Sequence, residues 1–146
     1  MVSSGNTVSN NVISANKYGV RLVNGSSGNS LTGNQMVDNG LAGLMISYAP
    51  ENIFRENQIS GSPVNFQIDA SSAEQYTQDI DITNTVDGKP IYYLVGMDDV
   101  FLDPASNAGC VVAVECSDII IEGLTFSNNA YGVVFAYTGY SVVEDC

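Results

Sequence analysis

The sequence repeats itself every 23 residues, and this period restricts the folds that the chain can adopt. The phrases NTVSNNVIS, NSLTGNQMV and NIFRENQIS begin at Asn6, Asn29 and Asn52. Self-similarity at a fixed period of roughly 20 to 50 residues is typical of solenoids, in which each repeat is a structural unit that stacks on the next one. The period therefore indicates a stack of similar coils.

Each repeat has the pattern of short strands separated by tight turns. Residues 19–23 (GVRLV) include the alternating apolar and polar side chains of a half-buried strand, and Gly and Asn occupy the gaps. Three sets of apolar residues recur at matching positions and are expected to stack inside: Val8, Leu31 and Phe54; Ile13, Met36 and Ile59; Val20, Leu44 and Phe66. We predict an all-β chain, a right-handed single-stranded parallel β-helix (solenoid) of about six coils of 22–23 residues.

The coils are expected to form one domain over residues 1–146. We predict regular coils at 6–60, less regular coils at 61–108 and regular coils again at 109–146. A leucine-rich repeat has a similar period, but its L-x-x-L-x-L frame is missing. Neither end shows the cap that solenoids need, so we expect a piece of a longer protein that associates end to end with other copies.

An Asn recurs at one turn of three successive coils, at Asn11, Asn34 and Asn57. Asn tolerates the left-handed backbone conformation that a sharp corner requires. Stacked amides can also hydrogen-bond along the axis of the rod. We therefore predict a structural asparagine ladder at these three positions.

The charge of the chain excludes several classes of partner. Four basic residues oppose sixteen acidic residues, which gives a net charge of −12. A surface of this sign repels phosphate backbones and anionic lipid headgroups. No apolar run approaches the roughly 18 residues that a membrane-spanning helix needs. We expect neither nucleic-acid binding nor membrane insertion.

The sulfur-containing side chains offer little for a metal site. Cys110, Cys116 and Cys146 include no C-x-x-C pair, and the chain has no His, so a zinc site is not indicated. Cys110 and Cys116 are expected to be buried free thiols. Met36, Met45 and Met97 are the other soft ligands that copper prefers, but Met36 falls at a core-facing repeat position.

One set of carboxylates falls into register. Alignment of DDVFLDP, SDIIIEG and YSVVEDC places Asp103, Glu122 and Glu144 at one outward position of three coils, with Asp99 and Asp118 as a second pair nearby. Such a column repels itself unless salt screens it or a cation neutralises it. The sequence leaves two alternatives, a solvated acidic face and a Ca²⁺ site.

Tyrosines provide a candidate carbohydrate-binding surface, because sugar rings stack on aromatic faces. Tyr93 and Tyr137 fall in register with inward positions, whereas Tyr92 takes the outward position that Arg21 holds in the first coil. Tyr92 is therefore the candidate for contact with a glycan.

Several segments together carry a family resemblance. The NxVxxNxI coils, NTVDGKPIYYLVG, GCVVAVECSDIIIEGLTFSNNAYGVVFAYT and SVVEDC resemble the NosD-like group of pectate-lyase-like parallel β-helix proteins, whose repeats also occur in surface proteins of methanogenic archaea. The resemblance implies an extracellular or cell-surface location and a role in binding or handling carbohydrate. For the founding members it also implies an accessory part in loading copper.

The sequence favours a structural or carbohydrate-binding module, with a polysaccharide or a cell-envelope glycan as partner, over an enzyme. Related hydrolases use Asp carboxylates with a His and an Arg, and this chain has no His; no spacing singles out the calcium site of a lyase. No catalytic residue and no cofactor is predicted other than Ca²⁺. The alternatives are a polysaccharide lyase or hydrolase fragment and a copper-handling accessory protein.

Overall fold

A computed structural model describes residues 3–146, which form parallel coils of short strands. We call residues 3–86 the first stack; it contains β1 (Thr7–Ser9), β2 (Val12–Ser14), β3 (Tyr18–Val23), β4 (Ser30–Thr32), β5 (Gln35–Val37), β6 (Ala42–Ser47), β7 (Ile53–Arg55), β8 (Gln58–Ser60), β9 (Val64–Asp69), the helix α1 (Ala73–Tyr76), β10 (Asp79–Ile80) and β11 (Thr85–Val86). We call residues 89–146 the second stack; it contains β12 (Lys89–Val95), β13 (Asp98–Leu102), the 3₁₀ helix Pro104–Ser106, β14 (Cys110–Val114), β15 (Ser117–Glu122), β16 (Val133–Ala136) and β17 (Val142–Glu144).

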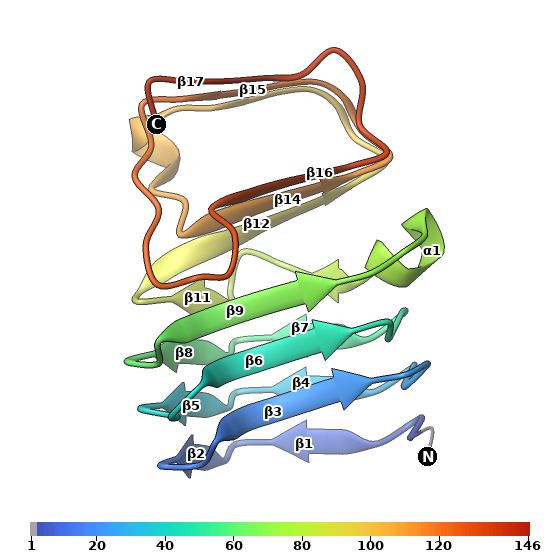
Figure 1. Cartoon of the computed structure of the whole chain (residues 1–146), viewed down its shortest axis with the longest axis vertical. Helices are drawn as coiled ribbons and strands as arrows, with labels where there is room; N and C mark the ends of the chain where they lie inside the picture. Colours follow the sequence, from blue (N-terminus) through green and yellow to red (C-terminus); the bar gives the residue numbers. More distant parts are fainter. Residues whose placement is uncertain (1–2) are drawn as a thin grey trace.

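The 23-residue period becomes the register of the first stack. Val8 pairs with Leu31 and Leu31 with Phe54 in β1, β4 and β7, and Ile13 pairs in the same way with Met36 and Ile59 in β2, β5 and β8. On the third side Val20 pairs with Leu44 and Leu44 with Phe66, across the one-residue insertion. All three predicted columns are confirmed. The coils of the first stack rise from the N-terminus with a right-handed sense (Figure 1), and the stacked parallel coils of the two stacks together make a β-solenoid of about six turns.

Asparagine side chains link the corners of the first stack. Asn11 Nδ2 donates to Asn34 Oδ1, Asn34 Nδ2 to Asn57 Oδ1 and Asn57 Nδ2 to Asn84 Oδ1, over 2.8–3.0 Å. A parallel line of bonds at the next corner joins Asn6, Asn29, Asn52 and Gln78. Each amide replaces a missing backbone partner at a corner, where the chain turns out of its sheet.

The backbone conformation expected for these asparagines is wrong in one respect. The left-handed residues are the ones just before them, at Asn10, Gly33 and Glu56, with φ of 57°, 65° and 55°. The corner therefore divides its two tasks between neighbours. One residue makes the sharp bend, and the following Asn bonds to the next coil.

The chain reverses direction between the two stacks. β11 and β12 pair antiparallel, with Val86 opposite Lys89 and Thr85 opposite Pro90. The two residues between them, Asp87 and Gly88, have φ of 48° and 76°, as a two-residue type I′ hairpin turn requires. One seven-stranded sheet, in the order β16-β14-β12-β11-β8-β5-β2, contains strands from both stacks. In it β12, β14 and β16 run opposite to β2, β5, β8 and β11.

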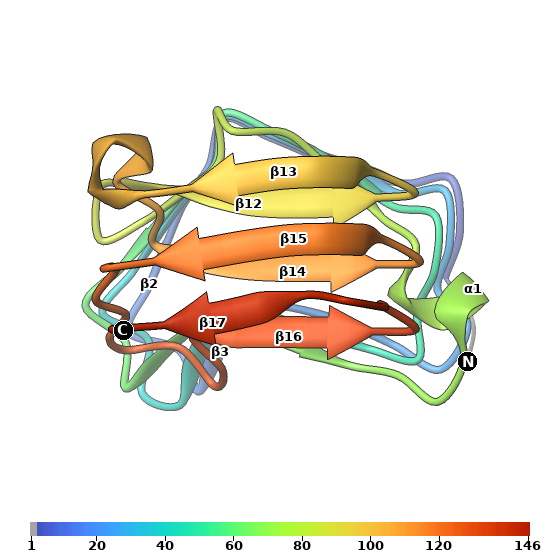
Figure 2. The same cartoon turned by 90° about the horizontal axis from the view of Figure 1, so that it is seen from above.

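The second stack has two sheets, and its coils follow one another in a direction that crosses the axis of the first stack. Its sheets are β12-β14-β16 and β13-β15-β17. The coils of the first stack lie one above another in Figure 1, whereas those of the second stack follow one another across the view of Figure 2. Asn65 N donates to Asn128 O and Ala130 N donates to Phe66 O, so the loop before β16 binds the edge of β9. The second stack therefore covers part of the end of the first one.

The sheet β12-β14-β16 lies between two cores, and its middle strand β14 is buried on both faces. One face contributes Ile91, Tyr93 and Val112 to the core of the first stack. The other face contributes Leu94 and Val111 to a second core that lies against β13 and β15. This position explains the uninterrupted apolar run CVVAV of β14, since strands that are covered on both sides lose the alternation of half-buried strands.

None of the helical segments in residues 3–146 has the length and apolar character needed to cross a lipid bilayer.

Candidate functional site

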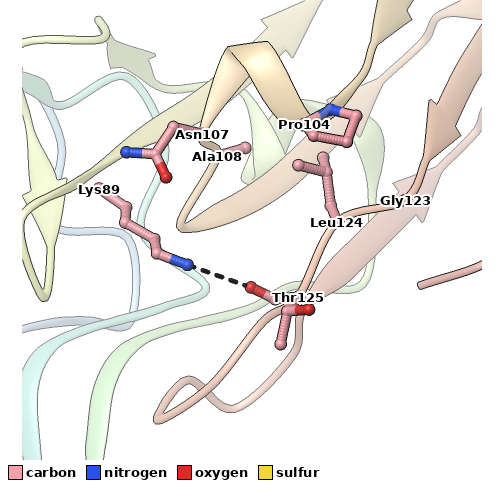
Figure 3. A pocket seen from close by; sticks show the side chains of 7 residues that line it. All are labelled: Lys89, Pro104, Asn107, Ala108, Gly123, Leu124 and Thr125. Atoms are coloured by element: carbon pink, nitrogen blue, oxygen red, sulfur yellow. Dashed lines mark hydrogen bonds between the residues drawn. The ribbon is translucent and has the colours of Figure 1, made fainter.

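A small pocket opens beside the hairpin at the start of the second stack. It has a volume of about 170 Å³ and is formed by the first residue of β12, the 3₁₀ helix with its C-cap, and the loop after β15 (Figure 3). Its lining residues are Lys89, Pro104, Asn107, Ala108, Gly123, Leu124 and Thr125. Of these, Ala108 and Leu124 are buried, and Lys89, Asn107 and Thr125 carry polar side chains.

Local sequence features hold the walls of this pocket in place. The Asp103 carboxylate accepts a hydrogen bond from Ala105 N at 3.0 Å and caps the 3₁₀ helix, in which Pro104 takes the first position. Asn107 ends that helix in the left-handed conformation, with φ of 49°. Lys89 Nζ lies 3.5 Å from Thr125 O and so joins the hairpin to the loop after β15.

A second hollow borders the same hairpin. It has a volume of about 360 Å³, and its lining residues are Gln58, Ile59, Ser60, Thr85 and Gly88. Gly88 lines this hollow and the next residue, Lys89, lines the first pocket. The two hollows are therefore neighbours at the hairpin. We call the two together the hairpin site. Its polar groups are a lysine ammonium, two side-chain amides and three hydroxyl groups, all of which can hydrogen-bond to a polyhydroxylated ligand.

Two of the three tyrosines with a predicted orientation, Tyr92 and Tyr137, lie differently from the prediction. Tyr92 is half-buried instead of outward-facing, because its ring packs against the second core, and its hydroxyl lies 3.4 Å from Ser106 O. Tyr93 is buried, as predicted, and its hydroxyl donates to Tyr76 O. Tyr137, predicted to point inward, is 62% exposed and donates to Ser71 O. The structure therefore gives no reason to place a sugar on Tyr92.

The predicted acidic column is on the outer face of β13-β15-β17. Glu122 pairs with Glu144 across β15 and β17, and both are exposed. Asp103, which follows β13, uses its carboxylate as the helix cap. Among residues 3–146, no three Asp, Glu, His or Cys side chains come together in an arrangement that could hold a metal ion.

This arrangement leads to a prediction about calcium. Exposed carboxylates that share no site interact with cations by general screening. We expect millimolar CaCl₂ and NaCl of equal ionic strength to raise the melting temperature equally, and Glu122→Gln to leave the two shifts equal. A larger rise with calcium that Glu122→Gln abolishes would restore the calcium site.

The soft ligands do not fit a copper site in the described part of the chain. Met36 is fully buried in the core of the first stack, Met45 is half-buried in β6, and Met97 is exposed in the turn between β12 and β13. The Cys116 thiol faces Leu94 O and Val114 O and accepts from Met97 N at 3.4 Å, so it serves as a turn residue as the asparagines do. Cys146 takes an equivalent place beside Leu124 N and Ile121 O. The two thiols stabilise turns, whereas the methionines are divided between the core, β6 and a turn.

The burial of two cysteines predicts a reactivity pattern. Cys110 and Cys116 are buried free thiols, as predicted, and burial raises the pKa of Cys110 to about 12. The thiolate is the reactive form. We expect a maleimide to label only the exposed Cys146 rapidly near pH 8, with the other two labelled after unfolding. Equal rates for all three in the native protein would contradict the burial.

Sequence reasoning missed the hairpin site. Lys89, Asn107 and Thr125 are 18 residues apart in each step (89, 107, 125), so the 23-residue period did not connect them. The dipeptide Asp87-Gly88 could have indicated the hairpin, because Asp-Gly is a favoured sequence for a type I′ turn between two strands.

Comparison with known proteins identifies a family. The family model described as "Periplasmic copper-binding protein (NosD)" matches residues 1–92. No curated protein and no solved structure matches the chain. Because the matched residues are more than half of the chain and the coils stack as a parallel β-solenoid, the chain belongs to the NosD family of β-helix proteins.

Proposed function

We propose that this chain is a structural module of an extracytoplasmic protein, secreted or at the cell surface, and that it binds a glycan at the hairpin site. The observation that carries the proposal is that Lys89, Asn107 and Thr125 line one pocket together with apolar residues. Sugars present hydroxyl groups at their edges and C–H groups on their faces, so a pocket lined by both polar and apolar side chains suits them. The periplasmic description of the family supports the location.

The shape of the site favours more than one sugar unit. A pocket of about 170 Å³ is smaller than the roughly 300–1,000 Å³ of usual ligand sites. The second hollow borders the adjacent residue Gly88 and offers Gln58, Ser60 and Thr85. An oligosaccharide that crosses the turn between Gly88 and Lys89 would contact both.

The charge of the chain restricts the class of glycan. The net charge of −12 repels polymers of uronic acids. Lys89 is the only basic residue of the second stack, and it can donate to a neutral hydroxyl or ring oxygen. We therefore expect neutral or amino-bearing oligosaccharides to bind and uronic-acid oligosaccharides to bind least.

Titration calorimetry with neutral, amino-bearing and uronic-acid oligosaccharides tests the proposal. We expect binding of the first or second class, a loss of about tenfold or more in affinity for Lys89→Ala combined with Thr125→Ala, and no change for the control Lys17→Ala. No heat with any class, or equal affinity for all variants, would reject the hairpin site. Release of reducing ends or unsaturated products would reject a purely binding role.

A further inference from the structure

The outer sheet of the second stack carries a continuous apolar row. Phe101 of β13 pairs with Ile120 of β15, and Ile120 pairs with Val142 of β17. These side chains are 57%, 40% and 44% exposed, whereas Ile119 and Ile121, which point inward, are fully buried. Figure 2 shows β13, β15 and β17 side by side as the nearest layer, with no segment in front of them. We call Phe101, Ile120 and Val142 the apolar row.

Carboxylates border the apolar row on both sides. Two residues further along the strands lie Asp103, Glu122 and Glu144, of which Glu122 and Glu144 pair directly. On the other side lie the exposed Asp99 and Asp118, which occupy equivalent places between the paired residues of β13 and β15. Asp99 and Asp118 have φ of 57° and 54°, so they mark a bend near the start of β13 and β15, and the apolar row follows this bend and precedes the row of Asp103, Glu122 and Glu144.

These carboxylates have no counter-charge in the described chain. Within residues 3–146 the ion pairs are those of Arg55 with Asp79 and Asp81, both in the first stack. Residues 90–146 contain no Lys or Arg at all. The carboxylates on the two sides of the apolar row therefore repel one another. A ligand with an apolar centre and cations on both sides would neutralise them and would also cover the row.

The chemistry of the row favours a peptide over a sugar. Sugar faces stack on flat aromatic rings, and the row has one ring, Phe101, followed by two branched aliphatic side chains. Branched aliphatic groups pack well against Leu, Ile or Val side chains, and lysine or arginine side chains reach outward to carboxylates. A second copy of this chain is a poor occupant of the face, because it would bring five more carboxylates against these five.

We propose that the outer face of β13-β15-β17 is a docking surface for a basic peptide segment of a partner protein, one whose apolar side chains lie on the apolar row with Lys or Arg on both sides. The surface is separate from the hairpin site. Its two kinds of contact give two separable signatures, because burial of the apolar row is insensitive to salt and the carboxylate contacts weaken as salt screens them.

Fluorescence anisotropy with a labelled synthetic peptide tests the proposal. The probe has Leu on one side of a helix flanked by Lys and is about 14 residues long, so that it spans about 20 Å. Two comparison peptides replace all Lys by Glu or all Leu by Ser. We expect the first peptide to bind the whole chain and both comparison peptides to bind at least about tenfold more weakly.

Matched variants locate the contact. Phe101→Thr with Ile120→Thr should weaken binding by about tenfold or more, whereas the exposed control Ile53→Thr in β7 should not. Glu122→Gln with Glu144→Gln should reduce the salt dependence of the dissociation constant, and the control pair Glu51→Gln with Glu56→Gln should leave it unchanged. All seven positions are exposed, so unchanged thermal melts would show that each variant is folded.

Three results would overturn the proposal. Binding that tolerates Phe101→Thr with Ile120→Thr would show non-specific attraction to an acidic protein. Equal binding of the Lys and Glu peptides would remove the role of the carboxylates. Preference for an amino-sugar oligomer over the peptide, lost in the same variants, would assign the face to a cationic glycan.

Discussion

Asn34→Ala should lower the free energy of unfolding by about 2–3 kcal/mol. The Asn34 side chain is fully buried and makes four hydrogen bonds with its neighbours. Its Nδ2 donates to Val8 O at 2.8 Å and to Asn57 Oδ1 at 3.0 Å, and its Oδ1 accepts from Asn11 N and Asn11 Nδ2. Alanine would leave these groups without partners in the middle of the first stack. Urea denaturation of both proteins measures the difference.

Asn24→Ala is the control for this prediction. Asn24 is exposed, and its side chain makes no equivalent bond to a neighbouring coil among the described residues. Its φ of 52° means that alanine there should still cost about 1 kcal/mol, because a Cβ disfavours the left-handed conformation. Equal destabilisation at the two positions would show that the asparagine hydrogen bonds between coils contribute nothing measurable.

Gly43→Ala should destabilise the protein by about 3 kcal/mol, because the coils approach too closely at this point for a side chain. A Cβ at Gly43 in β6 would overlap Ile59 Cγ2 and would lie 2.9 Å from Asn65 O. Both contacts belong to the next turn of the solenoid, and the backbone oxygen cannot move without breaking the register of β6 with β9. The midpoint of urea denaturation should fall accordingly.

Gly139→Ala is the matched control for Gly43→Ala. Gly139 also has an ordinary φ, and a Cβ there would have no atom within 4 Å. The substitution should change stability by no more than about 0.5 kcal/mol. A similar effect of both substitutions would contradict the close approach of β6 to the following coil.

The repeat predicts the first stack well, because in a solenoid residues that are one repeat apart in the sequence pair in adjacent strands. Val8, Leu31 and Phe54 stack as their spacing indicates, and Leu44 takes its place despite an inserted residue. Asn34 and its equivalents occur at the same spacing, so hydrogen bonds between coils could be expected.

The second stack departs from the prediction because tertiary burial overrides local pattern there. Period-2 alternation assigns Tyr92 to the outside, but β12 has a core on both of its faces. Tyr137 follows β16, where it has φ of 57° and turns out of the sheet, so alternation no longer fixes its direction. The hairpin site depends on the reversal at Asp87-Gly88, which brings Lys89 to the loop that contains Thr125.

The chain reverses after β11, so that the second stack crosses the first one and forms both proposed surfaces. The most direct test is a nuclear Overhauser effect between the amide proton of Asn65 and the protons of Asn128 and Asn129, together with one between the Ala130 amide and Phe66. The structure predicts both, because Asn65 N donates to Asn128 O and Ala130 N donates to Phe66 O. In a single uninterrupted stack these residues would lie more than two coils apart, at least about 10 Å, beyond the reach of the effect. Contacts only between residues about 23 positions apart, with none between 65–66 and 128–130, would contradict the reversal.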